Sequence, residues 1–253
     1  MIYFIDVQGT LISDEDKSPI NGAIEFIDHL NATSTPYVII TNNTKHSSKD
    51  FYNSLVQKGF NIPQDRYIDP LMVLEESVPK DGVAAYGAKQ FLTTLESMGY
   101  ELNYTDPKSV LVAIKEDFAS EEYAQMIEFL LSGSKLVGMH ETSLYAKNSK
   151  RYPGVGAILK MLEFATSSSY EVVGKPSELF YEKAKDLSGA KSFSDITIIS
   201  DDPKGDLEGA KALGMRCIFV TSGKYRDASE IVPHLRLKPD AVYADLGEVL
   251  KSL

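Results

Sequence analysis

The stretch Phe4-Ile5-Asp6-Val7-Gln8-Gly9-Thr10-Leu11 decides the fold that we expect, because an apolar run leads directly into a carboxylate and a turn. The β-branched and aromatic residues of Ile2–Asp6 predict a buried strand. Gly9 permits a sharp backbone turn after that strand. Asp and Gly are also common in ordinary turns, so Asp6 by itself is either a catalytic carboxylate or a turn residue.

Outward from this stretch, short apolar runs alternate with longer amphipathic segments. This pattern predicts an α/β protein in which helices cover both faces of a mainly parallel sheet. We predict core strands at Ile2–Asp6, Tyr37–Thr41, Glu171–Val173, Ile196–Ser200, Arg216–Val220 and Ala241–Tyr243. The predicted core helices are Gly22–Leu30, Ser48–Lys58, Glu178–Leu187, Asp206–Leu213 and Leu246–Leu250.

A second set of alternating elements interrupts this series. It comprises predicted strands at Val83–Tyr86, Val110–Ile114 and Lys135–Met139, and predicted helices at Ala88–Met98, Glu121–Leu131 and Val155–Phe164. The motifs described below lie on both sides of this region, which favours an inserted domain over one larger sheet. We therefore predict a core formed by residues 1–77 and 168–253, and an inserted α/β domain at residues 78–167.

Two strand ends carry groups suited to a phosphate. Thr41-Asn42-Asn43 follows the strand at Tyr37–Thr41, and its hydroxyl and amide groups can donate hydrogen bonds to an anion at a strand–helix junction. Helix capping is the structural alternative for this motif. Lys175, in Val172-Val173-Gly174-Lys175-Pro176-Ser177, can neutralise phosphate charge, although a lone lysine is more often simply solvated.

A third strand end is rich in acids. The strand Ile196–Ser200 runs into Asp201-Asp202-Pro203-Lys204-Gly205-Asp206. Carboxylate oxygens are hard ligands that suit Mg²⁺, and Asp201 is the expected ligand. The alternative for Asp202 and Asp206 is that they cap the next helix.

The composition excludes several classes of protein. A chain of 253 residues with 43% hydrophobic residues can bury a substantial core. A formal net charge of −10 opposes nucleic-acid binding, because that binding depends on Lys and Arg displacing counterions. Cys217 is the only cysteine, so an intrachain disulfide is impossible. The first residues lack a basic leader and no apolar run has membrane-spanning length, so we predict a cytoplasmic protein without a membrane partner.

Taken in order, the motifs resemble the haloacid dehalogenase superfamily over almost the whole chain. The motifs are Asp6-Val7-Gln8-Gly9-Thr10, Thr41-Asn42-Asn43, Gly174-Lys175-Pro176 and Ser200-Asp201-Asp202 through Asp206. The second and third motifs, the long insertion and Tyr152-Pro153-Gly154-Val155-Gly156-Ala157 are similar to the NagD-like, 4-nitrophenylphosphatase subgroup. This resemblance implies a Rossmann-like, doubly wound parallel-sheet core with an inserted α/β cap domain.

The resemblance also implies a set of residue roles. Asp6 is the expected nucleophile, which forms an aspartyl-phosphate, and Lys175 balances charge and orients it. Mg²⁺ is expected on the Asp6 carboxylate, the main-chain carbonyl of Gln8, and Asp201. Thr41, Asn42, Asn43 and Lys175 are the expected substrate-binding residues. Asp206 matches a second acid of the family, which is expected to support the residues around the metal and not to bind the metal directly.

Gln8 departs from the family pattern. In family phosphatases this position is usually an Asp that protonates the leaving group and then activates water. A carboxamide exchanges no proton near neutral pH, and general acid–base catalysis is worth about 10²–10⁴-fold. Only the backbone carbonyl of Gln8 is needed for metal binding, so we expect the metal site to be retained.

Three functional interpretations follow from Gln8. The first is a hydrolase for a small phosphorylated metabolite, slow or restricted to leaving groups that need little protonation. The second is a phosphotransferase that uses a longer-lived aspartyl-phosphate. The third is a catalytically weak protein that binds or senses a phosphorylated metabolite.

Two other fold assignments, a dinucleotide enzyme and a response-regulator receiver, agree less well with the sequence. The first strand is not followed by G-x-G-x-x-G, which argues against a dinucleotide enzyme. A response-regulator receiver would not explain the insertion and the four-motif series. The sequence leaves the oligomeric state open, with a homodimer through the cap as one option.

Overall fold

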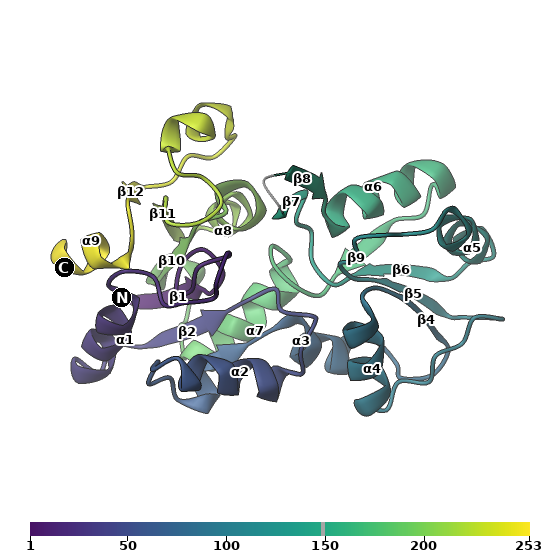
Figure 1. Ribbon diagram of the computed structural model, residues 1–253, viewed down its shortest axis with the longest axis horizontal. Helices are drawn as coiled ribbons and strands as arrows, with labels where there is room; N and C mark the ends of the chain where they lie inside the picture. Colours follow the sequence, from purple (N-terminus) through teal and green to yellow (C-terminus); the bar gives the residue numbers. More distant parts are fainter. Residues whose placement is uncertain (148–149) are drawn as a thin grey trace. The chain divides into compact units, whose positions relative to one another are not determined.

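The computed structural model describes residues 1–147 and 150–253 and divides into two compact units. Unit 1 comprises Met1–Thr41, Lys49–Ile68 and Glu178–Leu253, and unit 2 comprises Asn42–Ser48 and Asp69–Ser177. Figure 1 shows both in the colours of the sequence. The predicted inserted domain at residues 78–167 lies within unit 2, and its boundaries stay a prediction.

Unit 1 is built on one parallel sheet of six strands in the order β12-β11-β10-β1-β2-β3. The strands are β1 (Ile2–Asp6), β2 (Tyr37–Ile40), β3 (Tyr67–Ile68), β10 (Ile196–Ser200), β11 (Arg216–Val220) and β12 (Ala241–Tyr243). In the register of the central pair, Phe4 lies beside Ile198 and Ile5 beside Ile199. The chain reverses its winding at β1, and ligands of open parallel sheets bind at such switch points.

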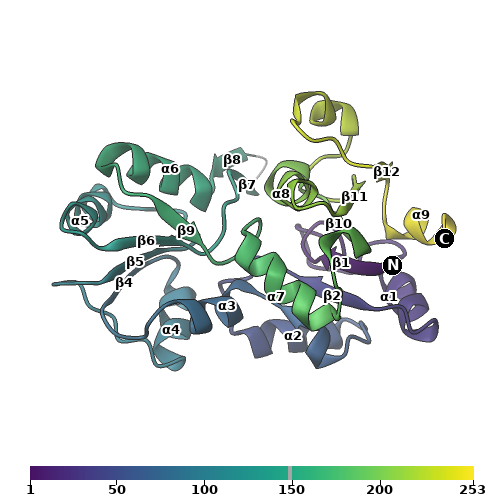
Figure 2. The same ribbon diagram turned by 180° about the vertical axis from the view of Figure 1, so that it is seen from behind.

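Helices cover both faces of this sheet. Its helices are α1 (Ala23–Ala32), α2 (Ser48–Gln57), α7 (Glu178–Ser188), α8 (Glu208–Ala212) and α9 (Leu246–Lys251), with short 3₁₀ turns at Gln64–Arg66, Phe193–Asp195, Ala228–Glu230 and Val232–His234. On one face, Tyr3 and Ile5 pack with Phe26 of α1, Leu55 of α2 and Val249 of α9. On the other face, α7 lies against β2 and α8 against β11, as Figure 2 shows from behind. The predicted doubly wound fold is thus confirmed.

Unit 2 has a parallel sheet of its own, in the order β4-β5-β6-β9, and an antiparallel hairpin, β7-β8. The strands are β4 (Val83–Tyr86), β5 (Ser109–Val112), β6 (Lys135–Gly138), β7 (Leu144–Lys147), β8 (Lys150–Pro153) and β9 (Tyr170–Val172). The helices are α3 (Pro70–Ser77), α4 (Lys89–Ser97), α5 (Ser120–Leu131) and α6 (Val155–Thr166). A core cluster joins this sheet to α5 and α6 through Val110, Met126 and Leu159, among others.

One predicted strand belongs to the other sheet. The run Glu171–Val173 was expected among the core strands, but β9 pairs with β6, where Glu171 lies beside Val137 and Val172 beside Gly138. The prediction was wrong because the backbone of a three-residue strand can form hydrogen bonds with either sheet. The apolar pattern of so short a strand does not indicate which sheet it joins. As a consequence, Lys175 follows a strand of unit 2 and not one of the core.

A second correction concerns the predicted helix at Asp206–Leu213. The chain forms a π-helical turn over Pro203–Leu207 and a short α-helix, α8, over Glu208–Ala212. Asp202 caps this turn, because its side chain accepts a hydrogen bond from the Gly205 amide. The short hairpin β7-β8, the two-residue strand β3 and helix α3 were missed.

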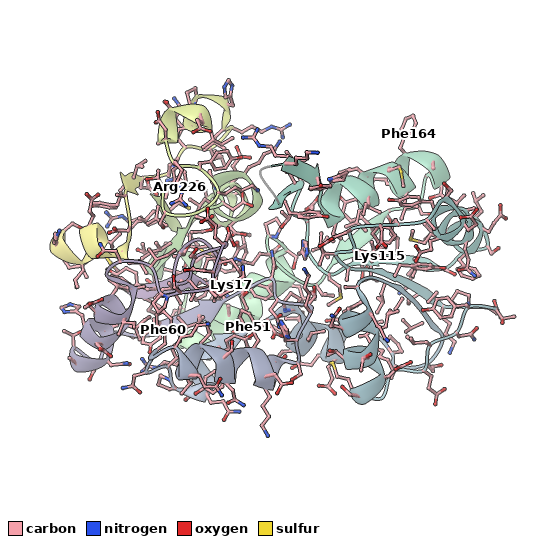
Figure 3. All side chains as sticks on the ribbon, viewed as in Figure 1. Lys17, Phe51, Phe60, Lys115, Phe164 and Arg226 are labelled. Carbon is pink, nitrogen blue, oxygen red and sulfur yellow. The ribbon has the colours of Figure 1, made fainter. Side chains whose placement is uncertain are left out.

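The described helices include none that is long and apolar enough to span a membrane. Exposed apolar side chains do occur on unit 2. Phe164 of α6, labelled in Figure 3, is 92% exposed.

Candidate functional site

Four predicted site residues meet at one edge of the sheet of unit 1. Asp6 ends β1, Gln8 lies two residues beyond it, Thr41 follows β2, and Asp201 follows β10. Because β1, β2 and β10 are adjacent and parallel, their carboxyl ends lie side by side. Asp6, Thr41 and Asp201 are each buried. The structure therefore brings Asp6, Gln8, Thr41 and Asp201 together.

The turn after β1 has the form that the opening stretch predicts. The carbonyl of Val7 accepts hydrogen bonds from the amides of Thr10, Leu11 and Ile12, at 3.3, 2.8 and 3.0 Å. Gly9 has a φ of +74°, the left-handed conformation that glycine adopts without steric cost. A Cβ on Gly9 would also lie 2.2 Å from the Asp201 carboxylate. Glycine is thus required here by both the turn and the close approach of Asp201.

The two acids at this edge influence each other. Burial raises the pKa of Asp201 well above its usual range, and the negative charges of Asp6, Asp202 and Asp14 raise it further. The Lys224 amide, which donates to Asp201 Oδ2 at 2.6 Å, opposes the shift. A divalent cation held by these carboxylates would offset the repulsion that adds to the effect of burial on this pKa.

The residues present fit a magnesium ion. The carboxylates of Asp6 and Asp201 supply hard oxygen donors, and the main-chain carbonyl of Gln8 accepts no hydrogen bond from the described residues. Over residues 1–147 and 150–253, no group of three or more His, Cys, Asp or Glu side chains is arranged to hold a metal. The proposed set contains two carboxylates and one main-chain carbonyl, so it is compatible with the absence of such a group from the described residues.

Gln8 uses its side chain to hold Thr41. The Thr41 hydroxyl donates to Gln8 Oε1 at 3.0 Å. The hydroxyl proton of Thr41 is therefore directed at a carboxamide. The nearby Thr10 hydroxyl is fully buried and, among the described residues, has no hydrogen-bond partner. Buried polar atoms are normally paired, so such an atom beside the nucleophile turn is unusual.

Asp202 and Asp206 have structural partners. Asp202 accepts from the Gly205 amide through Oδ1 at 2.9 Å and from the Lys224 ammonium through Oδ2 at 2.8 Å. Asp206 accepts from the Ser200 hydroxyl at 2.7 Å. The Ser200 hydroxyl in turn accepts from the Asp202 amide at 3.1 Å. These bonds fix the acidic turn after β10.

The predicted site residues do not include the loop after β11, which begins at Thr221. Ser222 donates from Oγ to the Gly9 carbonyl at 2.7 Å, and Lys224 contacts both Asp201 and Asp202. A Cβ on Gly223 would lie 2.0 Å from Asp201 Oδ2 and 2.5 Å from the Gly9 Cα. A usable signal was present, because Thr221-Ser222-Gly223-Lys224 also follows an apolar strand of the same sheet.

The remaining predicted residues, Asn42, Asn43 and Lys175, belong to unit 2. Asn42 Oδ1 accepts from the Lys175 amide at 2.9 Å, and Asn43 Nδ2 donates to the His46 carbonyl at 2.8 Å. A Cβ on Gly174 would lie 2.7 Å from Asn42 Oδ1. Within unit 2, the second and third motifs are therefore joined through Asn42 and the backbone of Lys175.

A Gly223→Ala substitution tests the close packing around Asp201. The added methyl group overlaps the Asp201 carboxylate and the Gly9 backbone, neither of which is a flexible chain end. We expect a loss of about 1–3 kcal/mol in the free energy of unfolding, the usual cost of overpacking. Urea denaturation followed by circular dichroism measures it. An unchanged midpoint would contradict the described packing.

The arrangement defines a class of protein, a Rossmann-like α/β fold with a buried carboxylate at the switch point of its sheet. A haloacid dehalogenase-like hydrolase model matches residues 3–101, and a HAD-hydrolase-like model matches residues 172–249. Together the two models match more than half of the chain. The chain belongs to the haloacid dehalogenase-like hydrolase family.

Similar proteins agree with this assignment. The chain is 30% identical to haloacid dehalogenase-like hydrolase domain-containing protein 2 of Bos taurus, over 89% of this chain and 86% of that protein. It is 26% identical to the human phospholysine phosphohistidine inorganic pyrophosphate phosphatase, over 98% of this chain and 92% of that protein. The p-nitrophenyl phosphatase structure from Archaeoglobus fulgidus matches with a TM-score of 0.86 and 22% identity, over 100% of this chain and 98% of that one.

These findings confirm two predictions. The family models confirm the resemblance to the haloacid dehalogenase superfamily, and the structural match agrees in fold with the 4-nitrophenylphosphatase subgroup. The chain is an enzyme of the hydrolase class, and the relatives named as phosphatases support a phosphoric monoester hydrolase.

Proposed function

We propose that this protein is a Mg²⁺-dependent phosphatase that acts on a small phosphorylated metabolite through an aspartyl-phosphate on Asp6. The observation that carries the proposal is the meeting of Asp6, the Gln8 carbonyl and Asp201 at the carboxyl edge of the unit 1 sheet. The family membership of the chain and the phosphatase names of its relatives support it.

The proposed reaction has two steps on Asp6. An Asp6 carboxylate oxygen attacks the phosphorus atom, the bond from phosphorus to the leaving-group oxygen breaks, and that oxygen departs with the electron pair. Water then attacks the phosphorus, which releases phosphate and restores the carboxylate. Asp6, the Gln8 carbonyl and Asp201 would hold Mg²⁺, which when bound would neutralise charge on the phosphoryl group and on Asp6. Thr41, Asn42 and Asn43 bind the phosphoryl group, and Lys175 balances its charge.

Gln8 restricts the leaving groups that such a site handles well. It holds Thr41 through its carboxamide but supplies no proton to the departing oxygen. Leaving groups that are stable as anions, such as nitrophenolate or phosphate, need no such proton. The human relative is named for phospholysine, phosphohistidine and pyrophosphate, and its pyrophosphate substrate releases a phosphate of this kind. We propose the same preference here.

A substrate panel tests the proposal. The purified chain is incubated with Mg²⁺ and with alkyl phosphates, p-nitrophenyl phosphate, pyrophosphate or phosphoramidates, and released phosphate is measured. We expect release from p-nitrophenyl phosphate or pyrophosphate to exceed release from alkyl phosphates, and EDTA to abolish it. The proposal fails if no compound yields phosphate and no phosphorylated protein is found by mass spectrometry after acid quenching.

The hydrogen bond between Thr41 and Gln8 favours a second candidate. A hydroxyl held by a carboxamide, with no proton donor at position 8, suits a site that binds a phosphorylated metabolite or keeps its aspartyl-phosphate long enough to transfer it. In the same panel, tight binding without phosphate release would identify a binding protein. Transfer of phosphate to an added alcohol in preference to water would identify a phosphotransferase.

A further inference from the structure

The loop after β11 connects the two acidic turns of the site. Ser222 bonds the Gly9 carbonyl beside the nucleophile turn, and the Lys224 amide bonds Asp201 Oδ2 after β10. Arg226, labelled in Figure 3, donates from Nη1 to the Ser222 carbonyl at 3.0 Å. All of these groups lie in unit 1. The loop is thus fixed to both turns by direct hydrogen bonds.

The side chain of Lys224 is held in place by an ion pair with Asp202. Its ammonium lies 2.8 Å from Asp202 Oδ2, and the two side chains are only 21% and 15% exposed. The other oxygen of Asp202 accepts from the Gly205 amide, which belongs to the turn that follows. Low exposure limits screening by solvent, so this pair fixes geometry better than a surface pair does. One residue therefore binds Asp201 through its backbone and Asp202 through its side chain.

This arrangement selects one oxygen of Asp201. Oδ2 is occupied by the Lys224 amide, whereas Oδ1 accepts no hydrogen bond from the described residues. The glycines at positions 9 and 223 pack against the same carboxylate so closely that a Cβ on either would lie 2.2 or 2.0 Å from Oδ2. Oδ1 is therefore the oxygen that remains for a cation.

We propose that Lys224 is a positioning residue for the divalent-cation site. Its ammonium anchors the loop to Asp202, so that its amide holds Asp201 with Oδ1 presented to the ion. Lys224 touches neither the ion nor the substrate in this scheme. The inference rests on the proposed function, because it assigns Asp201 as a cation ligand.

The direction in which cation affinity changes when Lys224 is replaced by a neutral residue distinguishes a positioning role from a purely electrostatic one. Lys224 is a positive charge beside a cation site, so its charge alone opposes cation binding. If charge were its only contribution, a neutral residue here would tighten binding. If Lys224 positions Asp201, a neutral residue weakens binding, and loss of a group that orients a metal ligand typically costs about 10–100-fold in affinity.

The test measures cation binding directly. Mg²⁺ and Mn²⁺ are titrated by calorimetry into the full chain after dialysis against EDTA, for the wild type, Lys224→Met, Lys224→Arg and Lys204→Met. Methionine keeps much of the aliphatic volume of Lys224, and a guanidinium can still bond Asp202. Lys204 is the matched control, because it is an exposed lysine in the same acidic turn with no ion pair among the described residues.

We expect Lys224→Met to weaken cation binding by about 10-fold or more, and Lys224→Arg to restore most of it. Lys204→Met should leave the dissociation constant unchanged or slightly lower. If Lys224→Met does not fold, as judged by circular dichroism, Ser222→Ala takes its place, because it releases the same loop from Gly9 with the same expected direction.

Two outcomes refute the inference in different ways. If the wild type binds the cation and a folded Lys224→Met binds it equally or more tightly, the positioning role is wrong and the proposed function is untouched. If the wild type binds neither Mg²⁺ nor Mn²⁺, the proposed Mg²⁺ dependence is wrong, and the role of Lys224 fails with it.

Discussion

Replacing Asp6 with asparagine is expected to lower kcat for phosphate-ester hydrolysis by about 10⁴–10⁶-fold, the range found when a covalent nucleophile is removed. A carboxamide lacks the anionic oxygen that attacks phosphorus, and it is also a poorer ligand for Mg²⁺. Asp6 lies at the end of a central strand that is paired on both sides, so the change removes the anionic oxygen and leaves the backbone of β1 in place. Phosphate release at saturating Mg²⁺ separates the loss of the nucleophile from weaker metal binding.

Asp186→Asn is the matched control for this variant. Asp186 is exposed on α7 in the same unit, so the same chemical change occurs away from the site. Mass spectrometry of acid-quenched protein should detect phosphorylated chain with the wild type and the control but not with Asp6→Asn. An Asp6→Asn variant that keeps more than a tenth of wild-type kcat would exclude Asp6 as the nucleophile.

Replacing Gln8 with aspartate is expected to raise kcat for alkyl phosphates by about 10²–10⁴-fold, the contribution typical of general acid–base catalysis. The carboxyl group supplies the proton that an alkoxide leaving group needs and later accepts one from the attacking water. The gain should be smaller for p-nitrophenyl phosphate, because nitrophenolate leaves without protonation. The ratio of the two gains is therefore the informative quantity, and steady-state phosphate release on both substrates measures it.

Gln8→Asn controls for the shorter side chain. Asparagine has the length of aspartate and the proton chemistry of glutamine, and both substitutions shorten the side chain that receives the Thr41 hydrogen bond. An equal increase with asparagine would show that freeing Thr41 matters, and that proton transfer does not. If aspartate brings no increase in a folded, metal-binding variant, the account of Gln8 is wrong.

Long apolar runs were the elements best predicted from sequence. β1 and β10 are found at the predicted residues, because each is a run of β-branched and aromatic residues of the kind expected for a parallel strand buried on both faces. Glu171–Val173 was assigned to the wrong sheet, since its few residues carry no information about their partner. The hairpin β7-β8 was missed because each strand has only four residues and β8 is polar, so neither resembles a core strand.

The sequence by itself determined the family, the parallel core and the identity of the chemical groups. Those properties follow from local patterns that can be read along the chain, namely a strand that ends in Asp6 and another that is followed directly by Asp201. Only the tertiary structure decided that Gln8 holds Thr41 and that Lys224 holds Asp201 and Asp202. Each of these contacts joins residues more than twenty positions apart, and such pairs are set by strand order and register, which no local pattern records.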